Sequence, residues 1–390
     1  MNLHLDKAGR FARIRAEMAA LDIDVLIGTR AGTVSYIAGA YLPWRSVVVF
    51  SRDGQETIFT FLIDHERIKH ESWVSDIVAY APQPGLDLWD LVIGHIKAKG
   101  WDKSNIGIEA GHSVRTNQGF LTSTEHQLIR EGLPGAKLVS ALAVIDKAAF
   151  IKDATEIALM RQAAAMADSA IATVKGQIEV GMSETMVAGI GEMELRRLGS
   201  EYHWSVTGGT EVASGYRAAW AFCGTTPASQ KIIQERENVI VDFHPCYRGY
   251  LSDLGHNIFL GQMTSEQQKL ADAYTDAAHV LVDSIKVGNS VRDVCRAVSS
   301  TLDKSGYLAH TIPAFGHGIG MIGNEWYAAI VDNDEFGDIV FEDNVVEVAF
   351  LCITIPGITG FRMECPVLAT PHGGEMLNST PLRPTVLPVD

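Results

Sequence analysis

Four polar side chains lie in apolar segments of the second half of the chain, where a polar group needs a specific partner. Asp242 lies inside the run VIVDF, and Asp253 follows eleven residues later, beyond a turn at YRGY. His317 stands between two glycines in FGHGIG, and Glu364 lies in FRMECPVL. A buried carboxylate is costly unless it is paired, hydrogen-bonded or bound to a cation. One histidine with three carboxylates suits zinc, manganese, cobalt or iron. The alternative is that each of the four has a separate structural partner.

A hydrolytic site at neutral pH also needs a group that moves protons, and histidine is the side chain best suited to this task. His317 can serve if no metal ion binds it. His244 is the second candidate, because it lies two residues after Asp242 and so shares that strand's face. Pro245 follows directly and can twist the histidine away, so a structural role for His244 stays open.

The first part of the chain alternates helix and strand patterns, as α/β domains do. Apolar residues at helical spacing predict a helix over residues 8–21. Apolar runs that predict strands follow at DVLIGT, SVVVF, ETIFTF and SNIGIEA. We therefore predict an α/β domain over residues 1–148 and a second domain over residues 149–390.

The second domain repeats one arrangement twice. Helix patterns near 153–177 and 183–198 precede the strand-like runs NVIVDFHP and YLSDLGHNIFLG, and those near 265–286 and 290–305 precede NVVEVAFLCITIPG and FRMECPVLAT. Asp153 and Glu156 have the spacing of a capping box at the start of the first helix. Two helices followed by a β-hairpin, twice over, are what a pseudo-symmetric duplication produces. The polar residues fall on the two hairpins, with His317 between them.

The composition argues against several classes of partner. Lys and Arg number 32 against 47 Asp and Glu, a formal charge of −15, whereas nucleic acids and anionic membranes are bound by basic surfaces. The chain has no run of about 18 apolar residues that would span a membrane. Its five cysteines form no C-x-x-C pair, and MNLHLDKAGRFAR lacks the apolar region of a signal peptide. We expect a cytoplasmic protein that acts on a small molecule.

Several of these segments together resemble one known family. IKDATEIALMRQAA, VDFHPCYRGYLSDLGHNIFLG, GHGIG and GFRMECPVLAT are similar to segments of the creatinase, prolidase and aminopeptidase P family. The resemblance implies an α/β N-terminal domain and an α+β C-terminal domain of the pita-bread fold. It also implies a five-ligand metal site of Asp, Asp, His, Glu and Glu. Four of these ligands match Asp242, Asp253, His317 and Glu364.

The chain also departs from the family's pattern at three positions. Phe350 stands where the fourth ligand, a glutamate, belongs. Glu347 is no obvious substitute, because a residue three positions away in a strand points to the opposite face. Asn324 takes the place of the family's second histidine, and Phe222 that of a further histidine. We expect these residues to line the substrate site.

The resemblance suggests further substrate-binding residues. In creatinase the region that matches Trp44 and Arg45 reaches across a dimer and holds the substrate's carboxylate. We therefore predict a homodimer in which Trp44 and Arg45 bind substrate, with a plain surface arginine as the alternative. Arg362 matches a family arginine beside the last glutamate, and we expect it to orient Glu364.

The lost glutamate and histidines favour a hydrolase of a C–N bond in a small polar non-peptide, as in creatinase or ectoine hydrolase. Its acidic cluster would act with His317 or His244. The alternative is a metal-dependent Xaa-Pro dipeptidase or aminopeptidase, which the four retained ligands favour. A lyase acting on a sulfonium compound and a non-catalytic binding module are weaker alternatives. Two expectations for the cofactor stay open: one divalent ion (Mn, Zn, Co or Fe), or a metal-free site whose carboxylates bind a cationic substrate.

Overall fold

The computed structural model describes residues 5–110, 120–201, 209–220, 226–321 and 327–389. Phe222 and Asn324, two of the predicted substrate-binding residues, lie outside this part of the chain. The described residues form two compact units. The first runs to Phe150 and also includes Met321, and the second begins at Ile151.

The first unit is an α/β sheet covered by helices. Its described strands lie in the order β4-β3-β2-β1-β5-β6, with β3/β4, β1/β5 and β5/β6 parallel. The strands are β1 Val25–Gly28, β2 Val47–Ser51, β3 Glu56–Phe61, β4 Ile77–Tyr80, β5 Asn105–Ile108 and β6 Lys137–Ser140. The helices are α1 Lys7–Ala20, α2 Ala31–Ala38, α3 His65–Glu71, α4 Leu88–Ala98, α5 Ser123–Gly132 and α6 Leu142–Phe150, with a short 3₁₀ turn η1 Leu62–Asp64.

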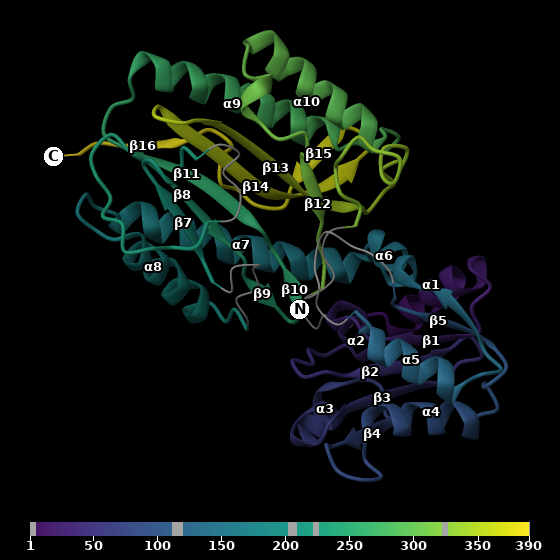
Figure 1. Cartoon of the computed structure of the whole chain (residues 1–390). Helices are drawn as coiled ribbons and strands as arrows, with labels where there is room; N and C mark the ends of the chain where they lie inside the picture. Colours follow the sequence, from purple (N-terminus) through teal and green to yellow (C-terminus); the bar gives the residue numbers. More distant parts are fainter. Residues whose placement is uncertain (1–4, 111–119, 202–208, 221–225, 322–326, 390) are drawn as a thin grey trace. The chain divides into compact units, whose positions relative to one another are not determined.

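The second unit holds a long sheet with two helix pairs. Its described strands lie in the order β12-β13-β14-β11-β8-β7, with β15 beside β14 and β16 beside β11 (Figure 1). The strands are β7 Glu211–Ser214, β8 Asn238–Phe243, β11 Leu254–Leu260, β12 Gly316–Gly318, β13 Val346–Ile355, β14 Thr359–Thr370, β15 Gly373–Met376 and β16 Thr385–Leu387, with a small separate pair β9 Cys246–Tyr247 and β10 Tyr250–Leu251. The helices are α7 Ala154–Gln177, α8 Glu184–Arg197, α9 Ser265–Ser284 and α10 Val291–Ser305, with a 3₁₀ turn η2 Leu308–His310.

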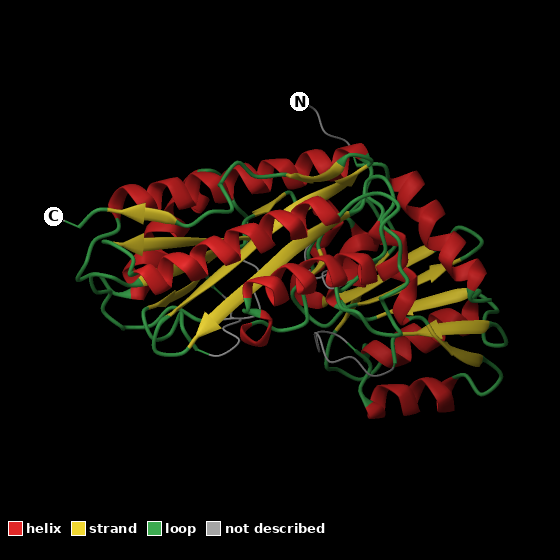
Figure 2. Ribbon diagram, turned by 90° about the horizontal axis from the view of Figure 1, so that it is seen from above, coloured by secondary structure: helices red, strands yellow, loops and turns green. Residues whose placement is uncertain are grey.

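The two halves of the second unit have the predicted repeat. Helices α7 and α8 pack together and contact the half made by β7, β8 and β11, whereas α9 pairs with α10 and contacts β13, β14 and β15. Figure 2 shows these helices running along the strands. The predicted capping box is confirmed: the Asp153 side chain accepts from the backbone amide of Glu156, and the Glu156 side chain accepts from the backbone amide of Asp153. It fixes the start of α7, which then packs through a face of buried alanines.

The two halves of the sheet meet where β11 pairs with β14. Gly255 lies opposite Glu364 in this pairing. A Cβ added at Gly255 would lie 2.9 Å from the backbone nitrogen of Glu364 and 3.5 Å from Asp242 Oδ1. Only glycine therefore allows the two strands to approach this closely, and the approach brings the carboxylates of both halves together.

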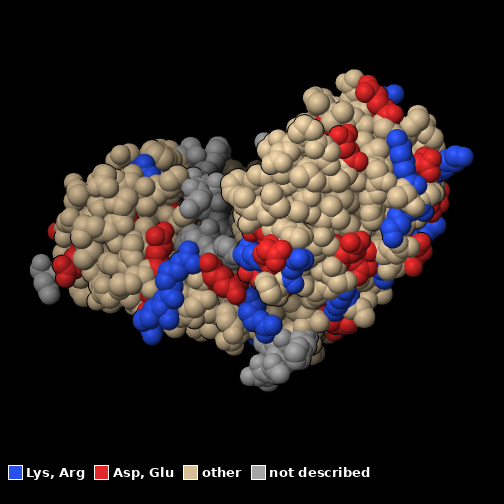
Figure 3. Space-filling view, turned by 90° about the horizontal axis from the view of Figure 1, so that it is seen from below, with Lys and Arg blue, Asp and Glu red and all other residues tan. Residues whose placement is uncertain are grey.

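The face drawn in Figure 3 carries charges of both signs. On the face drawn in Figure 3, the described Lys and Arg side chains lie among Asp and Glu side chains and form no continuous basic field. Within the described part of the chain, no helix is both long and apolar enough to cross a membrane.

Candidate metal and proton-handling site

The structure brings Asp253, His317 and Glu364 together in the interior of the second unit. His317 Nε2 lies 3.6 Å from Asp253 Oδ2 and 3.5 Å from Glu364 Oε2. One potential ligand atom from each of the three lies within 4.8 Å of the others, and all three side chains are buried. A residue of β12, a residue of β14 and the residue directly before β11 thus face one point, although 111 positions separate Asp253 from Glu364 in the chain.

The two glycines beside His317 fix its position. A Cβ added at Gly316 would lie 2.2 Å from the Val348 carbonyl oxygen, and one at Gly318 would lie 1.7 Å from that of Tyr327. His317 Nδ1 is 3.0 Å from the carbonyl oxygen of Gly318. Since a carbonyl only accepts, Nδ1 must carry a proton and donate it. Nε2 is then directed at the two carboxylates, the arrangement typical of a metal-ligating histidine.

Arg362 joins three carboxylates that come from three strands. Its Nη2 donates to Asp242 Oδ2 at 2.6 Å, and its Nη1 donates to Glu211 Oε2 at 2.8 Å. Its Nε donates to Glu364 Oε1 at 3.0 Å. Arg362 is 3% exposed, so these pairs are shielded from water. The predicted contact of Arg362 with Glu364 is present, and it leaves Glu364 Oε2 directed at His317.

Glu211 is a member of the cluster that sequence reasoning missed. It lies opposite Asp242 in the β7–β8 pairing, and the amide of Thr226 also donates to it at 3.2 Å. Strand β7 is held by Glu184 at the start of α8, whose Oε1 accepts from the Ser214 amide at 2.8 Å. A charged residue in the apolar run EVAS was the available signal, but four residues are too few for a clear strand pattern.

His244 reaches the cluster, so Pro245 does not turn it away. Its Nε2 lies 3.3 Å from Asp253 Oδ1 and 3.7 Å from Asp242 Oδ2. His256, by contrast, points elsewhere: its Nε2 lies 2.8 Å from Thr385 Oγ1 on β16. The catalytic role of His244 stays a prediction.

The carboxylates hold both histidines of the cluster in the protonated form. Burial alone would lower the pKa of His244, but Asp253 and Asp242 outweigh it and raise this pKa to about 10. Burial likewise opposes a charge on His317, whereas Glu364 and Asp253 raise its pKa to about 9. The cluster therefore favours positive charge strongly enough to overcome desolvation.

The pKa values of the carboxylates in the cluster shift in different directions. Burial, together with the charge of Glu364, raises the pKa of Asp242 and of Asp253. Burial also acts on Glu364, but Arg362 and the nearby histidine lower its pKa below the ordinary range. Glu364 is thus the carboxylate of the cluster that stays ionised most firmly.

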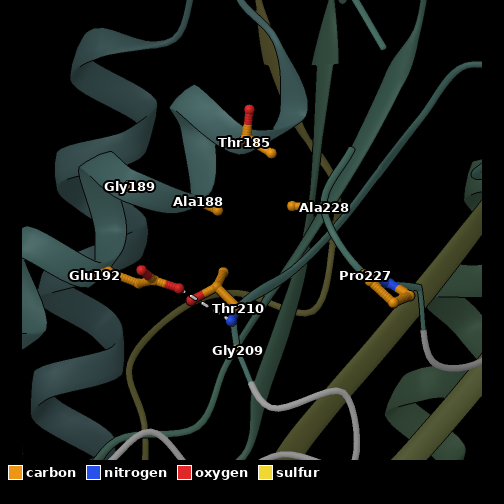
Figure 4. A pocket seen from close by; sticks show the side chains of 8 residues that line it. All are labelled: Thr185, Ala188, Gly189, Glu192, Gly209, Thr210, Pro227 and Ala228. Carbon is orange, nitrogen blue, oxygen red and sulfur yellow. Dashed lines mark hydrogen bonds between the residues drawn. The ribbon is translucent and has the colours of Figure 1, made fainter. Parts of the chain in front are cut away.

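A pocket of about 320 Å³ opens beside this cluster's outermost strand. Figure 4 shows its lining between α8 and the segments next to β7, with the side chain of Glu192 directed at Thr210. The amide of Thr210 donates to Glu192 Oε1 at 3.2 Å. Thr210 directly precedes Glu211, so the pocket borders the strand that carries this member of the cluster.

Comparison with known proteins identifies the family. Residues 158–371, more than half of the chain, match metallopeptidase family M24, and residues 10–149 match the creatinase/prolidase N-terminal domain. This chain belongs to metallopeptidase family M24. The predicted family, the α/β domain with a pita-bread domain, and the assignment as a hydrolase of C–N bonds are confirmed.

Members of family M24 resemble this chain over nearly its whole length. A Xaa-Pro dipeptidase from Lactobacillus helveticus is 24% identical over 362 residues, which cover 92% of this chain and 93% of the relative. The solved Xaa-Pro dipeptidase from Bacillus anthracis superposes with a TM-score of 0.82 at 25% identity, covering 98% of this chain and all of that one. An X-Pro aminopeptidase from Thermotoga maritima, at 21% identity and a TM-score of 0.82, supports the fold.

These relatives correct the function that the sequence favoured. The lost ligand and histidines pointed to a hydrolase of a small non-peptide, in the manner of creatinase or ectoine hydrolase. That prediction is wrong, because the matching relatives and solved structures are Xaa-Pro dipeptidases and prolidases. A few residues of the family's pattern are replaced at the site, but the chain as a whole is similar to Xaa-Pro dipeptidases.

Within the M24 site, Phe350 and Glu347 lie on opposite sides of β13. Phe350 pairs with Glu364 across β13 and β14, and its ring lies 5.8 Å from the Arg362 guanidinium carbon. Glu347 lies opposite Gly318 and is fully buried. Among the described residues, neither of its carboxylate oxygens has a hydrogen-bond partner. Burial raises the pKa of Glu347 to about 8.

Trp44 and Arg45, the predicted substrate-binding residues of the first unit, contact other residues of that unit. Arg45 forms a two-point ion pair with Glu125, with Nη2 2.8 Å from Oε2 and Nε 3.1 Å from Oε1. The ring of Trp44, whose residue is half exposed, lies 5.6 Å from that of Phe61. Substrate binding by Trp44 and Arg45 stays a prediction.

Proposed function

We propose that this protein is a metal-dependent Xaa-Pro dipeptidase. The observation that carries the proposal is the buried triad of Asp253, His317 and Glu364, in a chain that belongs to family M24. The dipeptidase activity of the relatives from Lactobacillus helveticus and Bacillus anthracis supports the choice of substrate.

The donor set fits a divalent transition-metal ion. Two carboxylates and one imidazole with a fixed tautomer are the ligands such an ion prefers. Among the described residues, the wider cluster has four carboxylates, Glu211, Asp242, Asp253 and Glu364, and one permanent cation, Arg362. Asp242 Oδ1 is buried without a hydrogen bond in the described part of the chain. A surplus of buried negative charge favours binding of a cation.

A divalent ion bound at the triad would act as a Lewis acid on the scissile carbonyl and make water a better nucleophile. The chain's own residues supply orientation and proton transfer. Arg362 fixes one oxygen of Glu364, and the Gly318 carbonyl fixes the ring of His317. His244 Nε2, beside Asp253 Oδ1, can hold a proton and deliver it to the departing prolyl nitrogen.

Hydrolysis of paired dipeptides tests this proposal. Purified protein is treated with chelator, reloaded with Mn²⁺, Co²⁺, Zn²⁺ or Fe²⁺, and offered Leu-Pro or the matched control Leu-Leu. We expect cleavage of Leu-Pro only after reloading, and little cleavage of Leu-Leu. Asp253→Asn should lower kcat/KM by at least about 100-fold, the upper range for loss of an outer partner of a metal ligand. Failure of folded protein to cleave Leu-Pro with any of the ions would refute the proposal.

We also propose that the chain forms a homodimer, which the resemblance to creatinase implies. Light scattering at micromolar concentration should give twice the 42.4 kDa of one chain. A mass of one chain would remove any role of Arg45 across a subunit interface.

A further inference from the structure

Ligand-type residues of the second unit form two triads within the described residues. The first is Asp253, His317 and Glu364, and the second is Glu211, Asp242 and His244. We propose that only the first triad binds a metal ion, because Arg362 pairs with the carboxylates of the second and His244 lies between Asp242 and Asp253. This inference rests on the proposed metal-dependent function and specifies it as a one-ion site.

One oxygen of each carboxylate of the second triad is already paired with Arg362. Glu211 Oε2 and Asp242 Oδ2 accept from two different nitrogens of the guanidinium, at 2.8 and 2.6 Å. An arginine keeps its charge at every accessible pH and presents its donors in a rigid plane. It therefore neutralises both carboxylates at the point where an ion would need them.

Arg362 cannot easily move aside to admit an ion. Its amide donates to Asn257 Oδ1 at 3.0 Å, and its carbonyl accepts from Asn257 Nδ2 at 2.7 Å. Asn257 is fully buried, and Asn238 Nδ2 donates to Asn257 Oδ1 at 3.0 Å. The backbone of β14 is thus fixed on both sides of the arginine, and its guanidinium is held by carboxylates from β7, β8 and β14.

His244 lies between Asp242 of the second triad and Asp253 of the first. Its Nε2 is 3.3 Å from Asp253 Oδ1 and 3.7 Å from Asp242 Oδ2. An imidazole N–H in this position attracts both carboxylates and occupies the space between them. His244 thus positions Asp253 for the first triad, in addition to the proton transfer proposed above.

The remaining donors suffice for one ion. After the contacts to Arg362 are subtracted, the first triad keeps Asp253 Oδ2, Glu364 Oε2 and His317 Nε2. On β13, the residue opposite Glu364 is Phe350, which offers no donor atom. Glu347, the acidic residue of the same strand, lies beside Gly318 instead.

Counting bound manganese tests the inference. Protein stripped with chelator is titrated with Mn²⁺, and bound ions are counted by native mass spectrometry and elemental analysis. Electron paramagnetic resonance then distinguishes isolated Mn²⁺ from a coupled pair. The variants are Asp253→Asn in the first triad, and Glu211→Gln and His244→Gln in the second. His244→Gln keeps all partners of Arg362, so it remains informative if Glu211→Gln fails to fold.

We expect one isolated ion per chain in the unaltered protein, one in both variants of the second triad, and none in Asp253→Asn. Two ions per chain, one of them lost in His244→Gln, would overturn the inference and leave the dipeptidase proposal intact. One ion that survives Asp253→Asn but is lost in His244→Gln would overturn it as well, by placing the ion in the second triad. No bound ion, together with no cleavage of Leu-Pro, would refute the proposed function itself.

Discussion

At the scale of single residues, the cluster depends on Arg362. This side chain is the shared partner of Glu211, Asp242 and Glu364, and it is 3% exposed. Removing one member of a buried ion pair leaves its partner as an uncompensated charge, which costs more than the pair contributes. Here one deletion would expose three carboxylates to that penalty at once.

We therefore predict that Arg362→Met lowers the free energy of unfolding by about 3–5 kcal/mol. The matched control is Arg161→Met, because Arg161 pairs with Glu375 at 2.7 Å on the surface. An exposed pair contributes about 1 kcal/mol or less. Denaturant unfolding in the presence of chelator measures both variants. Equal effects of the two substitutions would contradict the central role of Arg362.

Glu347 gives a second prediction, on pH. Burial raises its pKa to about 8 in the folded protein, whereas an unfolded chain has the ordinary value of about 4.5. Between these values the folded state binds a proton that the unfolded state releases, so stability falls as pH rises. The loss between pH 4.5 and 8 is of order 4 kcal/mol at most. In Glu347→Gln the part of this decline that Glu347 contributes should be absent, whereas the part that His244 and His317 contribute above about pH 6.5 should remain.

Denaturant unfolding of the unaltered protein and of Glu347→Gln at pH 5 and pH 8 measures this dependence of stability on pH. Parallel changes in the two proteins between these pH values would show that Glu347 is already ionised near neutrality.

Residue types and spacing revealed part of this site. Asp242, Asp253, His317 and Glu364 stood out because each interrupts an apolar run. Glu211 did not, since its partnership with Arg362 depends on the order of β14, β11, β8 and β7 in one sheet. Sheet order is a long-range property that no local pattern encodes.

At the scale of elements, the pairing of β11 with β14 joins the two halves of the site. Gly255 permits this pairing, because any Cβ there would lie 2.9 Å from the backbone nitrogen of Glu364. The repeated helices and hairpins were predictable from periodicity and capping signals. The contact between the hairpins was not, since it depends on the close approach of two distant strands at Gly255.

We predict that Gly255→Ala lowers the free energy of unfolding by about 1–3 kcal/mol and weakens metal binding, because the strands must separate. The control is Gly189→Ala in the middle of α8, where nothing lies within 4 Å of an added Cβ. Alanine there should be neutral or stabilise by about 0.5–1 kcal/mol. Thermal and denaturant unfolding compare the two. A Gly255→Ala protein as stable as the control would show that the sheet adapts freely at this point.

At the scale of the whole molecule, membership of family M24 explains more than the individual departures do. Phe350 and the substitutions at positions 222 and 324 suggested a non-peptide substrate when weighed alone. The similarity to Xaa-Pro dipeptidases extends over 92% of the chain, however, and corrects that prediction. A substitution at the site changes the side chains that are available there, whereas similarity over the whole chain indicates the class of reaction.

Metal binding should stabilise the whole protein. A ligand that binds only the folded state at 100 times its Kd adds about 2.7 kcal/mol to the free energy of unfolding. We expect a shift of this size with Mn²⁺ in the unaltered protein and in Gly189→Ala, and none in Asp253→Asn. Thermal unfolding with and without Mn²⁺ measures it. An equal shift in Asp253→Asn would place the ion outside the first triad.

The most direct test of the account is a titration of metal-free protein with Mn²⁺ while hydrolysis of Leu-Pro is followed. The account predicts that activity rises in proportion to bound manganese and reaches its maximum at about one equivalent per chain, since one triad supplies the ligands. Folded protein that binds manganese and yet leaves Leu-Pro intact at every ratio would contradict it.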